Sequence, residues 1–140
     1  MLRVVLDTNV YVSAFVFGGP PLDILTLGIR GRIAVFVSAP IREELRAVLR
    51  SKFGWPTRDV RGALDTIDAF ESLVVPRETI GVIKDDEPDN RILECAVEAS
   101  AHVIVSGDRH LRAIRAYRRI HIMTPREFLD ALSAGMFSAC

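Results

Sequence analysis

The chain has 140 residues, 49% of them hydrophobic, with 18 Lys and Arg against 18 Asp and Glu. This size allows one domain, residues 1–140, with a real core, and the hydrophobic content excludes a disordered chain. The balanced charge excludes long-range attraction to nucleic acid, so any such contact requires a local basic patch. No apolar stretch is long enough for a membrane span, the first residues lack a signal peptide, and two cysteines make no disulfide framework. We therefore expect a cytoplasmic protein that has no membrane contact and keeps its thiols reduced.

Short apolar runs alternate along the chain with segments of helical periodicity. Strands are expected at residues 2–6, 33–37, 102–105 and 120–122, with weaker strand candidates at 73–75 and 80–83. Helices are expected at residues 8–15, from 22 to an end near 28 or 31, and at 39–52, 57–72, 89–100, 109–117 and 125–132. Strands that alternate with helices of this length imply right-handed crossovers, and therefore an α/β fold whose parallel sheet carries helices on both faces.

Two of the expected strands lead directly to an aspartate. Asp7 follows the run 2–6, and Asp108 follows the run 102–105 after a Ser-Gly pair. In parallel sheets, ligands bind beyond the carboxyl ends of the strands, so two acids at that edge suggest a site for a divalent metal ion. Each aspartate also has a simpler interpretation, as the N-cap of the helix that follows.

Glu43 and Glu44 are distinguished by helical geometry. Ile41, Leu45 and Leu49 mark the buried face of the expected helix 39–52. At about 100° per residue, Glu43 points away from that face, whereas Glu44 lies on its margin and can reach over the edge of the sheet. Glu44 is the candidate ligand, although a solvent-facing glutamate is also compatible with this position.

The densest group of acids lies in residues 85–89, where only Glu87 and Pro88 separate two aspartates from Asp89. Four carboxylates in five positions repel one another unless they are solvated or share a cation. Asp89 falls in the first turn of the next helix, near the sheet edge, where a favourable interaction with the helix dipole is the alternative explanation. Ligand sets made of oxygen atoms suit Mg²⁺ or Mn²⁺.

Other chemistries find little support in the sequence. His102, His110 and His121 are scattered and have no zinc-ligand spacing, so we interpret them as structural or exposed. No phosphate-binding glycine loop and no serine-hydrolase nucleophile motif is present. An aspartyl phosphatase requires an acid where Asn9 stands, and a phospho-receiver domain requires a lysine after Val105, which is missing.

Five segments, taken in order, resemble the PIN-domain ribonucleases, and among these the VapC-like toxins of toxin–antitoxin pairs. The segments are residues 4–10, 44–49, 86–96, 103–108 and 122–129. The resemblance implies a three-layer α/β/α fold with a roughly five-stranded parallel sheet. It also implies Mg²⁺- or Mn²⁺-dependent cleavage of RNA, a homodimer, and inhibition by a cognate antitoxin.

The resemblance also assigns roles to individual residues. Asp7, Glu44, Asp89 and Asp108 match the metal-binding and catalytic acids. Asn9 and Ser106 match polar residues that orient a carboxylate, water or phosphate. Asp86 is a lesser candidate, for a role around the site without direct contact with the ion. Many relatives carry an acid two residues after the counterpart of Asp108, where this chain has His110, which puts the binding of a second ion in doubt.

A basic patch follows the last of these acids. Arg109, Arg112 and Arg115, with Arg118 and Arg119 beyond them, recur at roughly helical spacing and are candidates for binding RNA phosphates. A solvated helix face explains the same arginines equally well. The alternative function is a non-catalytic PIN-like module that binds a metal or a partner in RNA metabolism, against which the intact set of four acids argues.

Overall fold

The computed structural model describes residues 1–83 and 87–137. Along the chain, the elements are β1 (Arg3–Leu6), α1 (Thr8–Val16), α2 (Gly19–Ile29), β2 (Ala34–Ser38), α3 (Ala39–Ser51), α4 (Thr57–Phe70), β3 (Ser72–Val74), α5 (Glu87–Glu98), β4 (Val103–Val105), α6 (Arg109–Ile114), β5 (Ala116–Tyr117), β6 (Ile120–Met123) and α7 (Pro125–Ser133).

The strands form a six-stranded sheet in the order β3-β2-β1-β4-β6-β5. The first five strands in this order are parallel, and only β5 pairs antiparallel, with β6. The short apolar runs form the central strands because both faces of the sheet are covered, so that Val4, Val5 and Ile104 have no exposed surface. The expected α/β fold with a largely parallel sheet is confirmed.

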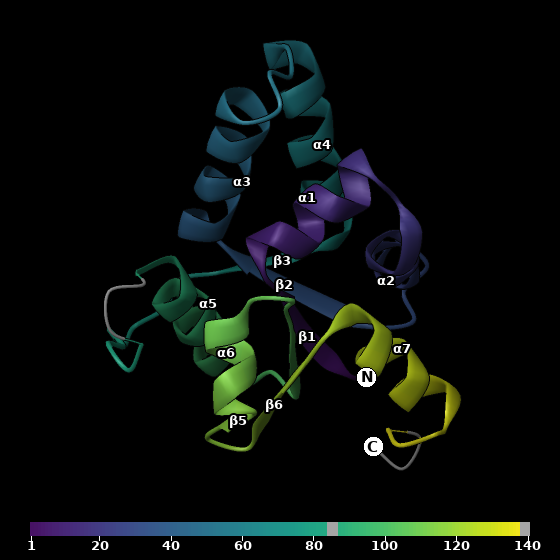
Figure 1. Ribbon diagram of the computed structural model, residues 1–140, viewed down its shortest axis with the longest axis vertical. Helices are drawn as coiled ribbons and strands as arrows, with labels where there is room; N and C mark the ends of the chain where they lie inside the picture. The colour runs from purple at the N-terminus through teal and green to yellow at the C-terminus, as the bar shows by residue number, and fades with distance from the viewer. Residues whose placement is uncertain (84–86, 138–140) are drawn as a thin grey trace.

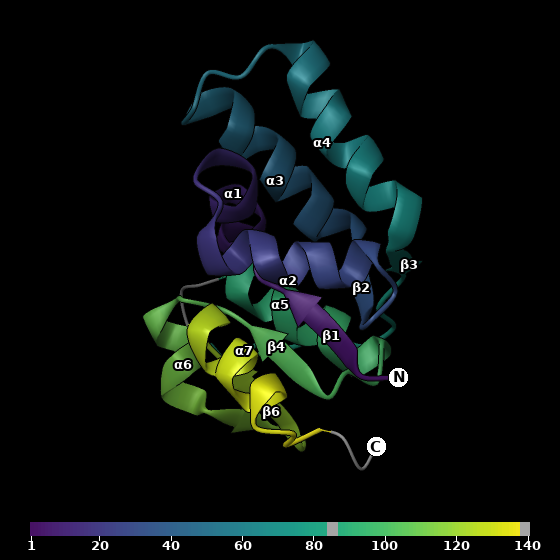
Figure 2. The ribbon, with the colours of Figure 1, turned by 90° about the vertical axis from the view of Figure 1, so that its right-hand side faces the viewer.

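Helices flank the sheet on both sides. In Figure 1, α5 and α6 lie on one side of β1, whereas α2 and α7 lie on the other. Contacts agree with this arrangement, because α5 packs on β1, β2 and β4 while α2 packs on α7. Helices α3 and α4 form an antiparallel pair that extends beyond the sheet (Figure 2), with α3 also contacting α1 and α5.

Residues 80–83 do not form the expected strand. The N–H of Ile80 donates to Oε2 of Glu94 at 2.8 Å, and the N–H of Ile83 donates to Oδ1 of Asn90 at 2.9 Å. Side chains of α5 thus satisfy the backbone groups that a neighbouring strand would otherwise pair.

The helix expected over residues 109–117 is shorter than predicted. It ends at Ile114, because Arg115 has a positive φ of 64°. The turn that follows β5 places Arg118 and Arg119 at φ angles of 48° and 71°, as a tight hairpin turn requires. The arginines from 109 to 119 therefore do not share one helix face, and Arg118 forms a double ion pair with Glu78.

Among the described residues, no single helix has the length and apolar character needed to cross a membrane. Helices α1 and α2 satisfy that criterion only in combination, with a bend of 101° between them.

A buried polar pair fixes α1, the helix that begins directly after Asp7. The hydroxyl of Tyr11, which has no exposed surface, donates a hydrogen bond to Oε1 of Glu71, the residue between α4 and β3. Burial raises the pKa of Glu71 to about 8, while the hydrogen bond from Tyr11 lowers it and the charge of Asp68 raises it. Glu71 is therefore protonated near neutral pH.

Glu71 should make stability depend on pH. The folded protein keeps this proton up to about pH 8, whereas the unfolded chain releases it near the ordinary value of 4.5. The free energy of unfolding should consequently fall between those values, by up to about 1.4 kcal/mol per pH unit. Glu71→Gln should remove this pH dependence. Measured by urea denaturation, the free energy of unfolding of the variant should therefore rise relative to that of the wild type from pH 5 to pH 8. A difference that stays constant across this range would contradict the assignment.

Candidate metal centre

The site begins where β1 and β4 end side by side. These strands are parallel, with Leu6 opposite Val105, and the N–H of Asp7 donates to the carbonyl of Val105 at 3.0 Å. Asp7 and Ser106 therefore leave the sheet together at its carboxyl edge. This is the edge at which the strand ends of a parallel sheet are open to ligands.

Asp7 occupies the N-cap position of α1, but its side chain makes no capping hydrogen bond. Oδ2 instead accepts a hydrogen bond of 2.7 Å from the hydroxyl of Ser106. The same hydroxyl accepts from the N–H of Asp108 at 3.0 Å, so Ser106 joins the two aspartates. The 2.7 Å hydrogen bond of this carboxylate therefore joins it to Ser106 rather than to the first turn of α1.

Burial and neighbouring charge work against ionisation of Asp7, which is only 4% exposed. Burial is the main cause that raises the pKa of this carboxyl, to about 6, while the hydrogen bond from Ser106 lowers it. The negative charges of Asp108 and Glu44 raise the pKa further, and the backbone N–H of Asn9 lowers it slightly. Asp108 and Glu44 thus lie near enough to Asp7 for their negative charges to disfavour its ionisation, an effect that a bound cation would relieve.

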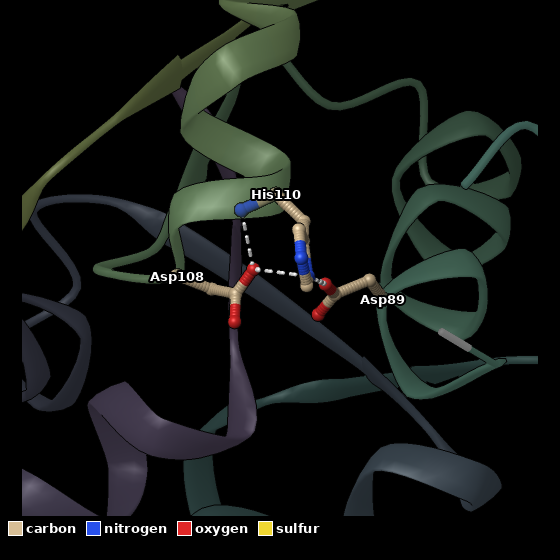
Figure 3. Close-up of side chains that lie close together, drawn as sticks. All are labelled: Asp89, Asp108 and His110. Carbon is tan, nitrogen blue, oxygen red and sulfur yellow. Dashed lines mark hydrogen bonds and ion pairs between the residues drawn. The ribbon is translucent and has the colours of Figure 1, made fainter. Parts of the chain in front are cut away.

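Asp89, Asp108 and His110 form the tightest cluster of potential ligands among the described residues. One donor atom from each lies within 4.8 Å of the others, as Figure 3 shows. The ring Nδ1 of His110 is 3.8 Å from Oδ2 of Asp89 and 3.7 Å from Oδ1 of Asp108. Asp89 is buried in the first turn of α5, whereas the side chain of Asp108 is 26% exposed. Asp7 and Glu44 lie outside this cluster, and Asp108 connects the two groups.

Asp108 also has the structural role that the sequence left open. Its Oδ1 accepts hydrogen bonds from the N–H groups of His110 at 2.8 Å and Leu111 at 3.4 Å, which caps α6. A carboxylate has acceptor capacity for a cap and a cation together, so the two roles are compatible.

The two adjacent glutamates of α3 differ as expected. Glu43 is exposed and pairs with Arg46, whereas Glu44 is partly buried and acts electrostatically on Asp7. The period of the helix was sufficient to separate them, because Leu45 and Leu49 are fully buried on the face that Glu44 borders.

The remaining residues singled out from the sequence are less tightly connected to the acids. Asn9 is exposed on the first turn of α1, and Asp86 lies outside the described residues. Arg109 and Arg112 are exposed on α6, directly after Asp108, while Arg115 is the exposed residue at which that helix ends.

His110, which the sequence interpretation took as structural or exposed, is exposed, and its ring lies beside Asp89 and Asp108. Its place in the sequence, two residues after Asp108 at the second position of α6, was the available signal for this proximity. His102, by contrast, is structural as expected, since its Nδ1 accepts a hydrogen bond of 2.9 Å from the N–H of Arg3.

The donor set fits a divalent cation. Two carboxylates and an imidazole lie within reach of one ion, and the buried carboxylate of Asp7 lies near the negative charges of Asp108 and Glu44.

Ser106→Ala should destabilise the folded protein, because Ser106 donates a hydrogen bond to the buried carboxylate of Asp7. The buried carboxylate would lose the donor that stabilises its charged form, which should lower the free energy of unfolding by about 1–3 kcal/mol. Urea denaturation in EDTA at pH 7 measures this effect, with Ser51→Ala, at an exposed end of α3, as the control. Equal stability of the two variants would show that the hydroxyl does not support Asp7.

Comparison with known proteins identifies the family to which this fold belongs. A PIN-domain family model matches residues 3–110, which is more than half of the chain. The chain is 32% identical over 146 residues to the uncharacterized protein MJ1680 of Methanocaldococcus jannaschii, covering 92% of this chain and 90% of that protein. It also resembles a chain in the crystal structure of VapBC2 from Rickettsia felis bound to a DNA fragment from their promoter. That likeness has a TM-score of 0.61 at 16% identity, over 86% of this chain and 97% of that one. The protein belongs to the PIN-domain family.

Proposed function

We propose that this protein is an endoribonuclease that hydrolyses RNA phosphodiester bonds with bound Mg²⁺ or Mn²⁺. The observation that carries the proposal is the convergence of Asp89, Asp108 and His110 beside the buried Asp7 at the carboxyl edge of the sheet. Membership in the PIN-domain family supports the same reaction class.

The residues divide the work as follows. The ion would be held by Asp7, Asp89 and Asp108, and Glu44 would add a fourth negative charge beside it. The hydrogen bond from Ser106 would keep the carboxylate of Asp7 in place. Bound there, a divalent ion supplies Lewis-acid chemistry that polarises the scissile phosphate and acidifies water. In the absence of a cation, the same carboxylates repel an RNA phosphate, so EDTA should abolish cleavage.

Exposed arginines beside the acids suit the backbone of the substrate. Arg109 and Arg112 lie on α6 immediately after Asp108, where they would offset the negative charge of RNA phosphates. Arg115, at the end of this helix, would extend that contact.

Glu44→Gln should lower the rate of RNA cleavage by about 100-fold, the usual cost of removing one electrostatic contributor to catalysis. Glu43→Gln is the matched control, because it changes the adjacent exposed residue of the same helix and should leave cleavage unchanged. Asp7→Asn should abolish cleavage. The measurement is cleavage of defined RNAs with added Mn²⁺, with and without EDTA, using circular dichroism to check folding.

Cleavage that persists in folded Asp7→Asn, or in EDTA, would rule out this nuclease site. Tight Mn²⁺ binding without any cleavage of RNA would favour the alternative, a non-catalytic PIN-like module that binds a metal or a partner.

We further propose that the nuclease acts in the cytoplasm as the toxin of a toxin–antitoxin pair, forms a homodimer, and binds a cognate antitoxin. The structural likeness to a chain of VapBC2 supports this role. So does apolar surface at and after the end of α1, where Phe17 is 75%, Leu22 41% and Ile29 52% exposed.

Expression of the wild type in a bacterial host should arrest growth, because uncontrolled RNA cleavage stops translation. Asp7→Asn should not arrest growth, and co-expression of a small gene adjacent to this one in its genome should restore it. Growth measured by optical density, with immunoblots to confirm equal expression, is the test. Normal growth with active, well-expressed enzyme would indicate a role in RNA turnover rather than toxicity.

A further inference from the structure

The ring of His110 is directed toward the acids. Capping of α6 uses the backbone N–H of His110, which donates to Oδ1 of Asp108, and does not involve the ring. The side chain is 50% exposed, yet its Nδ1 lies between the carboxylates of Asp89 and Asp108 (Figure 3).

We propose that Nδ1 of His110 is itself a metal ligand, and that this nitrogen shifts the preference of the site from Mg²⁺ toward first-row transition ions. The inference rests on the metal site proposed above and adds the identity of one ligand and the class of ion.

The distances are close to those between ligands that share an ion. Two ligands that each lie about 2.1 Å from an octahedral ion are about 3 Å apart when adjacent and about 4.2 Å apart when opposite. The separations of 3.8 Å and 3.7 Å from Nδ1 to the two carboxylates fall between these limits. A small movement of the half-exposed ring is enough to complete the coordination.

The chemistry of the donors sets the direction of the selectivity. Mg²⁺ prefers oxygen ligands and retains water, whereas imidazole is a good ligand for transition ions. A site with one imidazole among carboxylates therefore gains more affinity for Mn²⁺, Co²⁺ or Zn²⁺ than for Mg²⁺. The other two described histidines do not share this position, since His102 binds the backbone of Arg3 and His121 is exposed on β6.

Pulsed electron paramagnetic resonance of Mn²⁺ bound to the full chain tests the ligand directly. In protein with ¹⁵N-labelled histidine, the wild type should show the coupling of a directly bound ¹⁵N nucleus. His110→Ala should lose that coupling, whereas His121→Ala, the matched control, should retain it.

Competition between the two ions tests the selectivity. The Mg²⁺ concentration that displaces half of the bound Mn²⁺ gives the ratio of affinities without any assay of activity. His110→Asp, which converts the cluster to carboxylates alone, should lower the preference for Mn²⁺ by about tenfold, a typical effect of changing the immediate surroundings of a metal.

The outcomes separate this inference from the proposed function. Mn²⁺ that binds near the acids and supports RNA cleavage, but shows no histidine nitrogen coupling, would overturn the inference and leave the nuclease standing. Coupling that survives in His110→Ala, or an unchanged preference in His110→Asp, would also overturn it. Absence of Mn²⁺ binding would overturn both.

Discussion

The hydrogen bonds of one serine hydroxyl hold two aspartates at the open edge of the sheet, and the candidate metal site depends on that arrangement. Ser106 donates to the carboxylate of Asp7 and accepts from the N–H of Asp108, so the ends of β1 and β4 are tied together at their acids. Asp7 is buried and surrounded by like charge, and the pKa of its carboxyl is raised to about 6. Replacing Asp7 by an apolar residue should increase the stability of the fold in the absence of a metal ion, because a buried carboxylate near other carboxylates lowers the free energy of unfolding.

Packing around the acids explains how the structure tolerates this charge. The central strands are buried on both faces, so the positions of their carboxyl ends are fixed by the core. Within α1, the helix that begins after Asp7, Tyr11 donates a hydrogen bond to Glu71, which remains protonated near neutral pH and so places no further negative charge inside the molecule. The two buried carboxyl groups thus differ in role: Glu71 shares a hydrogen bond in the interior, whereas Asp7 faces other acids at the edge where a ligand can enter.

Hydrophobic periodicity predicted most of the fold, because buried strands and amphipathic helices leave clear patterns. It failed at residues 80–83, where side chains of α5 bind the backbone, and at Ala116–Tyr117, where a turn at two arginines forms a short hairpin. Neither feature produces a periodic pattern in the sequence. At the candidate site, the helical period separated Glu44 from Glu43, and the strand ends located Asp7 and Asp108. The proximity of His110 to the acids could not be predicted from histidine spacing, because its neighbours are two aspartates, one of them 21 positions earlier in the sequence.

The central claim is that side chains distant in sequence share one divalent ion at the carboxyl edge of the sheet. Anomalous X-ray diffraction from crystals grown with Mn²⁺ tests it most directly, because the anomalous signal locates the ion independently of the protein atoms. We expect a strong peak within about 2.5 Å of carboxylate oxygens of Asp89 and Asp108. A well-ordered site that shows no such peak at saturating Mn²⁺, or a peak bound elsewhere on the protein, would contradict the account.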